Sequence, residues 1–171
     1  PLVGIDHPDP VSIMPIPSPP GGQYMLLITE EDMYPIATLP KDVAIACIAT
    51  VGSCQPCAPH VANFKQSALQ NAVSDLSAHF GVAATSFDGW SAPELAGWAK
   101  ENGVADIVTT EAPVGFVAPK LEQLGQDLAA QGVKLHLVRL QWDDLCWPHA
   151  RKGFFVFKEN IPAIIRDLNL A

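Results

Sequence analysis

Residues 105–140 read ADIVTTEAPVGFVAPKLEQLGQDLAAQGVKLHLVRL, and this stretch decides the fold class. Residues 105–110 form a short apolar run that is typical of a buried strand. After the loop 111–115, residues 116–130 repeat apolar side chains at helical spacing, and residues 133–140 form a second apolar run. Two strands joined by a helix make a βαβ unit, which predicts a parallel sheet.

The same alternation recurs along the chain. Further strands are predicted at residues 24–29, 43–49 and 83–87, and further helices at 60–79, 92–102 and 162–168. In the helix 60–79, Phe64 falls on the apolar face, and Ser91 with Glu94 forms a capping box before the helix 92–102. We therefore predict a three-layer, Rossmann-like α/β domain, with helices on both faces of a five-stranded parallel sheet.

Three regions are expected. Residues 1–22 hold seven of the sixteen prolines and predict an extended arm. Residues 23–141 form the α/β domain, and residues 142–171 form an aromatic and basic tail with a helix near its end. Because the chain begins Pro-Leu-Val-Gly, without Met, we expect a processed or partial chain.

Composition narrows the function classes. A formal net charge of −8 disfavours direct binding to nucleic acid, although Arg151, Lys152 and Lys158 make the tail locally basic. No apolar run approaches the roughly 18–20 residues that span a membrane. Four cysteines in a chain of this size do not resemble a secreted disulfide framework, which favours a reducing, cytoplasmic setting.

A ligand pocket is expected where the first and fourth strands end. Loops diverge there in parallel sheets and leave backbone amides free. The loop before Phe116 also offers a helix N-terminus, and Gly115 permits close backbone approach. No glycine-rich dinucleotide or P-loop motif is present. The candidate binding residues are Thr29, Glu30, Glu31, Thr109, Thr110, Glu111, Pro113, Val114 and Gly115.

Cys54-Gln-Pro-Cys57 stands between a predicted strand and a predicted helix, which is where thioredoxin-like proteins carry a redox pair. No later proline is placed to pack against the motif, so an incidental pair of thiols is the competing interpretation. A zinc site built from Cys54, Cys57 and His60 would need a distant fourth ligand, such as Cys146 or His149.

Aromatic side chains crowd the tail. Exposed together, they would form an interface; buried, they would pin the tail to its own domain. The candidate interface residues are Trp142, Trp147, Phe154, Phe155 and Phe157.

The series of elements from 24 to 140 resembles the N-terminal α/β domain of the DNA photolyase and cryptochrome family. The likeness rests on the strand that runs into Ile28-Thr-Glu-Glu-Asp32, on Trp98-Ala-Lys-Glu-Asn-Gly103 leading into Asp106-Ile-Val-Thr-Thr110, and on Lys134-Leu-His-Leu-Val138. The tail Trp147-Pro-His-Ala-Arg-Lys-Gly-Phe-Phe-Val-Phe157 resembles the connection toward the flavin domain of bacterial members.

The resemblance implies an antenna domain that holds a folate, a deazaflavin or a flavin. It implies a separate helical flavin domain as the partner that carries photorepair, or self-association, and no catalysis by this chain alone. Two other functions stay open: a thiol–disulfide oxidoreductase that uses Cys54 and Cys57, and a scaffold that uses the aromatic tail.

Overall fold

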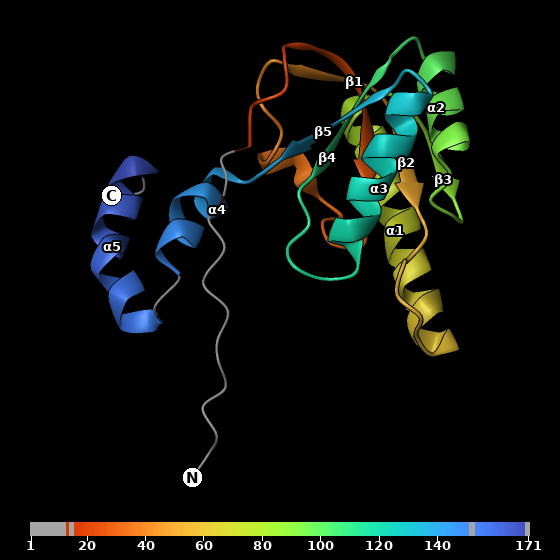
Figure 1. The fold of residues 1–171 in the computed structure, drawn as a ribbon. Coiled ribbons are helices and arrows are strands. Elements are labelled where there is room, and N and C mark those ends of the chain that lie inside the picture. The colour runs from red at the N-terminus through yellow and green to blue at the C-terminus, as the bar shows by residue number, and fades with distance from the viewer. Residues whose placement is uncertain (1–12, 14–15, 151–152, 170–171) are drawn as a thin grey trace. The chain divides into compact units, whose positions relative to one another are not determined.

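The computed structural model describes residues 13, 16–150 and 153–169. Its centre is a parallel sheet of five strands in the order β3-β2-β1-β4-β5 (Figure 1). This confirms the predicted fold class. The strands are β1 (Gly22–Ile28), β2 (Val43–Val51), β3 (Ala83–Phe87), β4 (Asp106–Thr110) and β5 (Lys134–Val138).

β1 occupies the middle of the sheet and is its most deeply buried strand. The five residues Tyr24–Ile28 are all buried, which explains their unbroken apolar run. From β1 the chain proceeds outward to β2 and β3 on one side, and then returns to add β4 and β5 on the other. The order in which strands are added to the sheet therefore reverses between β1 and β4. Sheets of this kind often bind ligands at this switch point.

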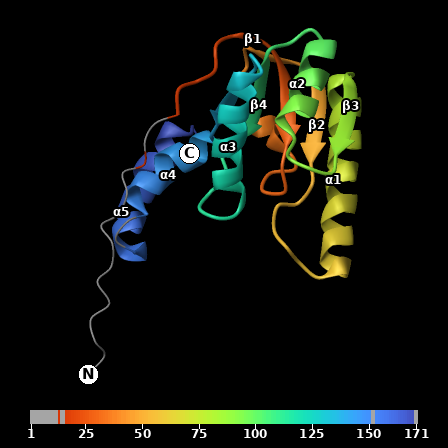
Figure 2. The same ribbon diagram turned by 45° about the vertical axis from the view of Figure 1, so that its right-hand side comes forward.

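Helices cover both faces of the sheet (Figures 1 and 2). α1 (Pro59–Phe80) packs on one face through Leu69, Val73 and Leu76. α2 (Ala92–Glu101) and α3 (Val117–Ala130) pack on the other face, through residues that include Leu95 and Leu121. The expected Ser91 cap is present, because its hydroxyl accepts the Glu94 backbone N–H at 3.4 Å.

The N-terminal half of α1 runs past the carboxyl ends of the strands (Figure 2). The buried residues of α1 all lie from Leu69 onward. Phe64, which the sequence placed on the apolar face, is 74% exposed, so that part of the prediction was wrong. The reason is that the sheet ends before this turn of the helix and offers the ring nothing to pack against.

The described residues form two compact units: Pro17–Arg139 makes up the first, and the second includes the residues from Leu140 onward. The second unit contains the helix α4 (Gln141–Cys146), the short 3-10 helix η2 (Trp147–His149) and the helix α5 (Phe154–Asp167). α5 begins well before the predicted start at Pro162, which lies inside the helix. Arg151, Lys152 and most of the arm 1–22 lie outside the described residues.

None of the described helices has the length and apolar content that crossing a membrane requires.

Gly52 allows the ends of β2 and β3 to approach closely. A Cβ at this position would lie 2.2 Å from the backbone carbonyl oxygen of Asp88. The Trp90 indole N–H donates to the Gly52 carbonyl at 2.8 Å and holds the same junction from the other side. The loops that follow the two strands are therefore fixed relative to each other.

We predict that Gly52→Ala destabilises the fold by roughly 1–3 kcal/mol, because the methyl group meets backbone rather than a side chain that can move. Urea unfolding measures the change. Gly97→Ala is the matched control, since nothing lies within 4 Å of its added Cβ in α2. The control should gain roughly 0.5–1 kcal/mol. Equal stability of Gly52→Ala and the wild type would contradict the close packing.

Candidate functional site

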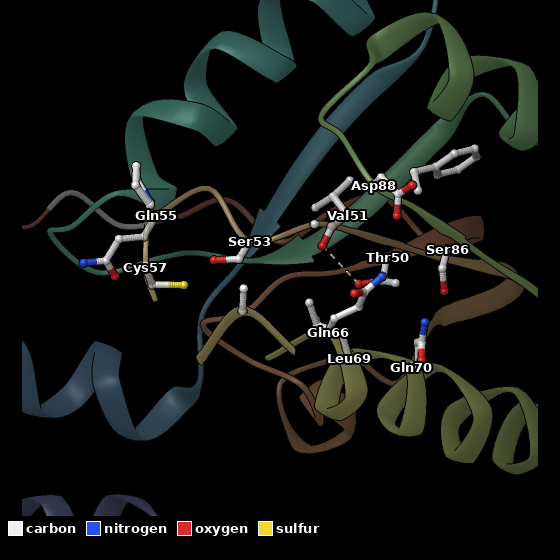
Figure 3. A pocket seen from close by; sticks show the side chains of 14 residues that line it. Thr50, Val51, Ser53, Gln55, Cys57, Gln66, Leu69, Gln70, Ser86 and Asp88 are labelled. Atoms are coloured by element: carbon white, nitrogen blue, oxygen red, sulfur yellow. Dashed lines mark hydrogen bonds between the residues drawn. The ribbon is translucent and has the colours of Figure 1, made fainter. Parts of the chain in front are cut away.

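A cleft of about 350 Å³ opens at the carboxyl ends of β2 and β3. Its walls are the loop after β2, the N-terminal half of α1 and the end of β3 (Figure 3). The polar residues that line it are Thr50, Ser53, Gln55, Cys57, Gln66, Gln70, Ser86 and Asp88.

Periodicity explains how these side chains reach the cleft. Along a strand, alternate residues face the same side, so Thr50 and Ser86 face α1 while Val51 and Phe87 pack toward the other face. On α1, Gln66 and Gln70 are one turn apart and point toward the strand ends (Figure 3). Leu69 and Ala62 add an apolar floor.

The polar groups of the cleft are largely uncommitted. The Thr50 hydroxyl donates to the Ile28 carbonyl at 3.0 Å, and the Ser53 hydroxyl donates to Glu30 at 2.7 Å. Within the described part of the chain, however, the side chains of five lining residues make no hydrogen bond or ion pair. These are Gln55, Gln66, Gln70, Ser86 and Asp88.

Next to the cleft, the Glu30 carboxylate holds several elements together. It receives the Lys65 ammonium at 2.5 Å, the Ser53 hydroxyl at 2.7 Å and the Cys54 backbone N–H at 2.9 Å. Its side chain is only 8% exposed. Lys65 comes from α1 and Ser53 from the loop after β2, so one carboxylate joins the end of β1 to both walls of the cleft.

Burial alone would raise the pKa of Glu30, but the hydrogen bonds from Lys65, Ser53 and Cys54 outweigh it and lower the pKa. The hydrogen bond to Glu30 in turn raises the pKa of Lys65. Both groups therefore stay charged at neutral pH.

The loops that follow β1 and β4, where the sequence predicted a ligand pocket, lie close together in the structure. A Cβ on Gly115 would lie 4.0 Å from the Glu31 carboxylate. The Thr110 hydroxyl donates to Asp32 at 2.8 Å, and Glu111 is bound by two nitrogens of Arg139. Asp32, Thr110 and Glu111, at the ends of β1 and β4, therefore have partners within the protein.

The other nominated residues divide into buried and exposed groups. Thr29 and Thr109 are buried, and the Thr29 hydroxyl accepts the Glu31 backbone N–H at 3.4 Å. Pro113 is exposed, and Val114 projects fully into solvent. None of the nine lines the β2–β3 cleft.

Cys54 and Cys57 lie in the loop before α1, which begins only at Pro59. Burial, followed by the hydrogen bond and the negative charge of Glu30, raises the pKa of the Cys54 thiol. A thioredoxin-type nucleophile requires the opposite direction. Cys57 is exposed and lines the cleft.

The zinc alternative finds no support in the described residues, because they contain no group of three or more His, Cys, Asp or Glu side chains arranged to hold a metal ion.

Two of the aromatic candidates at the start of α5 are strongly exposed: Phe154 at 64% and Phe155 at 80%. Trp142 on α4 is 43% exposed, whereas Trp147 and Phe157 are half-buried. The apolar start of α5 therefore stays a candidate interface.

Comparison with known proteins leaves the family open: no protein-family model matches the chain, and no curated protein matches its sequence.

Apart from Cys57, which was a redox candidate, the sequence analysis missed the polar residues of the cleft for a specific reason. It applied the rule about strand ends to the first and fourth strands and not to the second and third. Ser53 lies two residues after the end of β2 and Asp88 directly follows β3, and these positions were the available signal. Gln66 and Gln70 had no signal, because exposed glutamines on a helix are ordinary.

We predict that Glu30→Gln lowers the free energy of unfolding by roughly 1–3 kcal/mol at pH 7, because Lys65 loses its charged acceptor. Because the pKa of Glu30 is lower in the folded state, its ionisation stabilises the fold at pH values above the ordinary pKa of 4.5. This contribution is lost as the pH falls through the folded-state pKa. The difference between wild type and variant should therefore shrink on acidification. Denaturant unfolding from pH 7 to pH 3 measures it.

The control is Glu122→Gln on the exposed surface of α3, which should leave the profile unchanged. A difference between wild type and Glu30→Gln that stays constant with pH would contradict the role of Glu30.

For the cysteines, we predict that Cys57 is alkylated faster than Cys54 at pH 8, because the thiolate is the reactive form. Buried Cys47, whose pKa burial raises to about 11, should not react in the folded protein. Glu30→Gln should speed the alkylation of Cys54 and leave Cys57 unchanged. Mass spectrometry of iodoacetamide-treated protein resolves each site. A Cys54 thiol that titrates below about 8.5 would return weight to the oxidoreductase hypothesis.

Proposed function

We propose that this domain binds a small polar molecule in the β2–β3 cleft and holds it as a cofactor or chromophore. One observation carries the proposal: five solvent-exposed polar side chains, which have no partner among the described residues, converge on one cleft at the carboxyl edge of a parallel sheet. At the neighbouring ends of β1 and β4, Asp32, Thr110 and Glu111 are already paired within the protein, so fewer polar side chains are free to bind a ligand there.

The size of the cleft limits the ligand. Pockets for small molecules and cofactors range from about 300 to 1,000 Å³, and a cleft of about 350 Å³ is at the low end. It can enclose one fused ring system and leave a longer side chain in solvent, but it is too small for a whole dinucleotide.

The groups nearest the cleft do not form an activated nucleophile. The Ser53 hydroxyl donates to Glu30, and Lys65 keeps its proton in the ion pair with the same carboxylate. A serine needs a neighbouring base that can take its proton. We therefore propose a binding role without catalysis by this chain alone.

The resemblance to photolyases supports a particular form of this proposal. In that form the bound molecule is an antenna chromophore, such as a folate, a deazaflavin or a flavin. A partner with a helical flavin domain then carries the chemistry. This form predicts absorption between 300 and 500 nm in the protein as purified.

The proposal predicts a bound molecule that mass spectrometry detects after denaturation, coloured or not. Gln70→Trp should lower its occupancy at least about tenfold, because the indole fills the cleft. Asn71→Trp is the matched control: the position is also exposed on α1, but it does not line the cleft.

Gly115→Trp tests the competing site between β1 and β4. The closest non-neighbouring atom to an added Cβ is 3.9 Å away, so the variant should fold. We expect it to keep the ligand. Loss of the ligand in Gly115→Trp and not in Gln70→Trp would move the site to the ends of β1 and β4. A protein that carries no ligand, and takes none from an extract of small molecules, would contradict the proposal.

A further inference from the structure

This inference rests on the proposed function and concerns the chemistry of the ligand. The only charged side chain among the described residues that line the cleft is the carboxylate of Asp88. No lysine, arginine or histidine is among these lining residues. The nearest cation on the α1 wall, Lys65, is bound to Glu30. A phosphate placed here would meet a carboxylate and no compensating charge.

Asp88 stands on a fixed support. It follows the last residue of β3, and its backbone packs against Gly52, where a Cβ would come within 2.2 Å of its carbonyl oxygen. The Trp90 indole is hydrogen-bonded to Gly52 at 2.8 Å and holds the chain on its far side. The carboxylate is exposed and makes no hydrogen bond or ion pair with any described residue.

A carboxylate has two acceptor oxygens and no donor. Its closest chemical complement without charge is a pair of hydroxyls on adjacent carbons, which donate one hydrogen bond to each oxygen. In dinucleotide-binding sheets, an acidic side chain accepts a hydrogen bond from the ribose 2′-hydroxyl. Gln66 and Gln70 supply both donors and acceptors for the rest of the molecule.

We infer that the cleft selects an uncharged ligand with a vicinal diol, and that Asp88 binds the two hydroxyls. Either a ribonucleoside or a free sugar carries this chemistry. Among the proposed chromophores, the ribityl chain of an unphosphorylated flavin or deazaflavin also carries it, whereas a folate does not. A nucleoside phosphate does not fit, because the cleft provides no cation for it.

Isothermal titration calorimetry of the full chain tests the inference with adenosine, 2′-deoxyadenosine, AMP and D-ribose. Adenosine should bind at least about tenfold more tightly than 2′-deoxyadenosine, the usual effect of a lost hydrogen bond to a charged group. AMP should bind more weakly than adenosine. If D-ribose binds as tightly as adenosine, the cleft is a sugar site. If adenosine binds and D-ribose does not, the cleft is a nucleoside site.

Asp88→Asn should reduce the preference for adenosine over 2′-deoxyadenosine to less than about threefold, because the amide keeps one acceptor and loses the charge. Asp75→Asn, on the exposed surface of α1 and outside the cleft, should preserve the full preference. Thermal unfolding confirms that both variants fold.

Equal affinity for adenosine and 2′-deoxyadenosine, tighter binding of AMP, or no binding of any diol would overturn the inference. The proposed function would survive each result if Gln70→Trp still removed a different bound molecule. It would fail separately if that variant had no effect on any ligand.

Discussion

The arrangement of loops at the carboxyl edge of the sheet depends on one buried carboxylate. Glu30 leaves the central strand β1 and binds Lys65 of α1, Ser53 of the loop after β2 and the backbone of Cys54. A buried carboxylate is costly unless charged and polar donors surround it, and these three contacts together offset that cost. Because Ser53 also lines the cleft, the same requirement that keeps Glu30 ionised places one wall of the candidate site.

The polar side chains at the carboxyl edge of the sheet differ between its two halves. Around β1 and β4, Asp32 pairs with Thr110 and Glu111 pairs with Arg139, so the polar groups bind each other. Beyond β2 and β3, five polar side chains of the cleft have no protein partner among the described residues, and Gly52 brings the two strand ends close together. Ligand sites of parallel sheets are usually sought at the switch point. Here the free hydrogen-bonding capacity lies one strand further out.

The sheet could be predicted from sequence because its strands are covered on both faces and read as continuous apolar runs, as at Tyr24–Ile28. Periodicity alone misplaced Phe64, since it cannot show where the sheet ends beneath a helix. The last helix was predicted to start at Pro162, but α5 begins at Phe154 and contains Pro162 in its interior. The Glu30–Lys65 pair joins residues far apart in the chain, and no local pattern indicates which acidic residue of the loop points inward.

The most direct test of this account is a map of amide shifts in ¹H–¹⁵N NMR spectra as the molecule that copurifies with the protein, or adenosine in its place, is added to ligand-free protein. The account predicts that the shifts cluster at Ser53, along α1 around Gln66 and Gln70, and from Ser86 to Asp88, while residues 109–116 stay unchanged. Shifts confined to residues 109–116 would contradict it and place the ligand between β1 and β4.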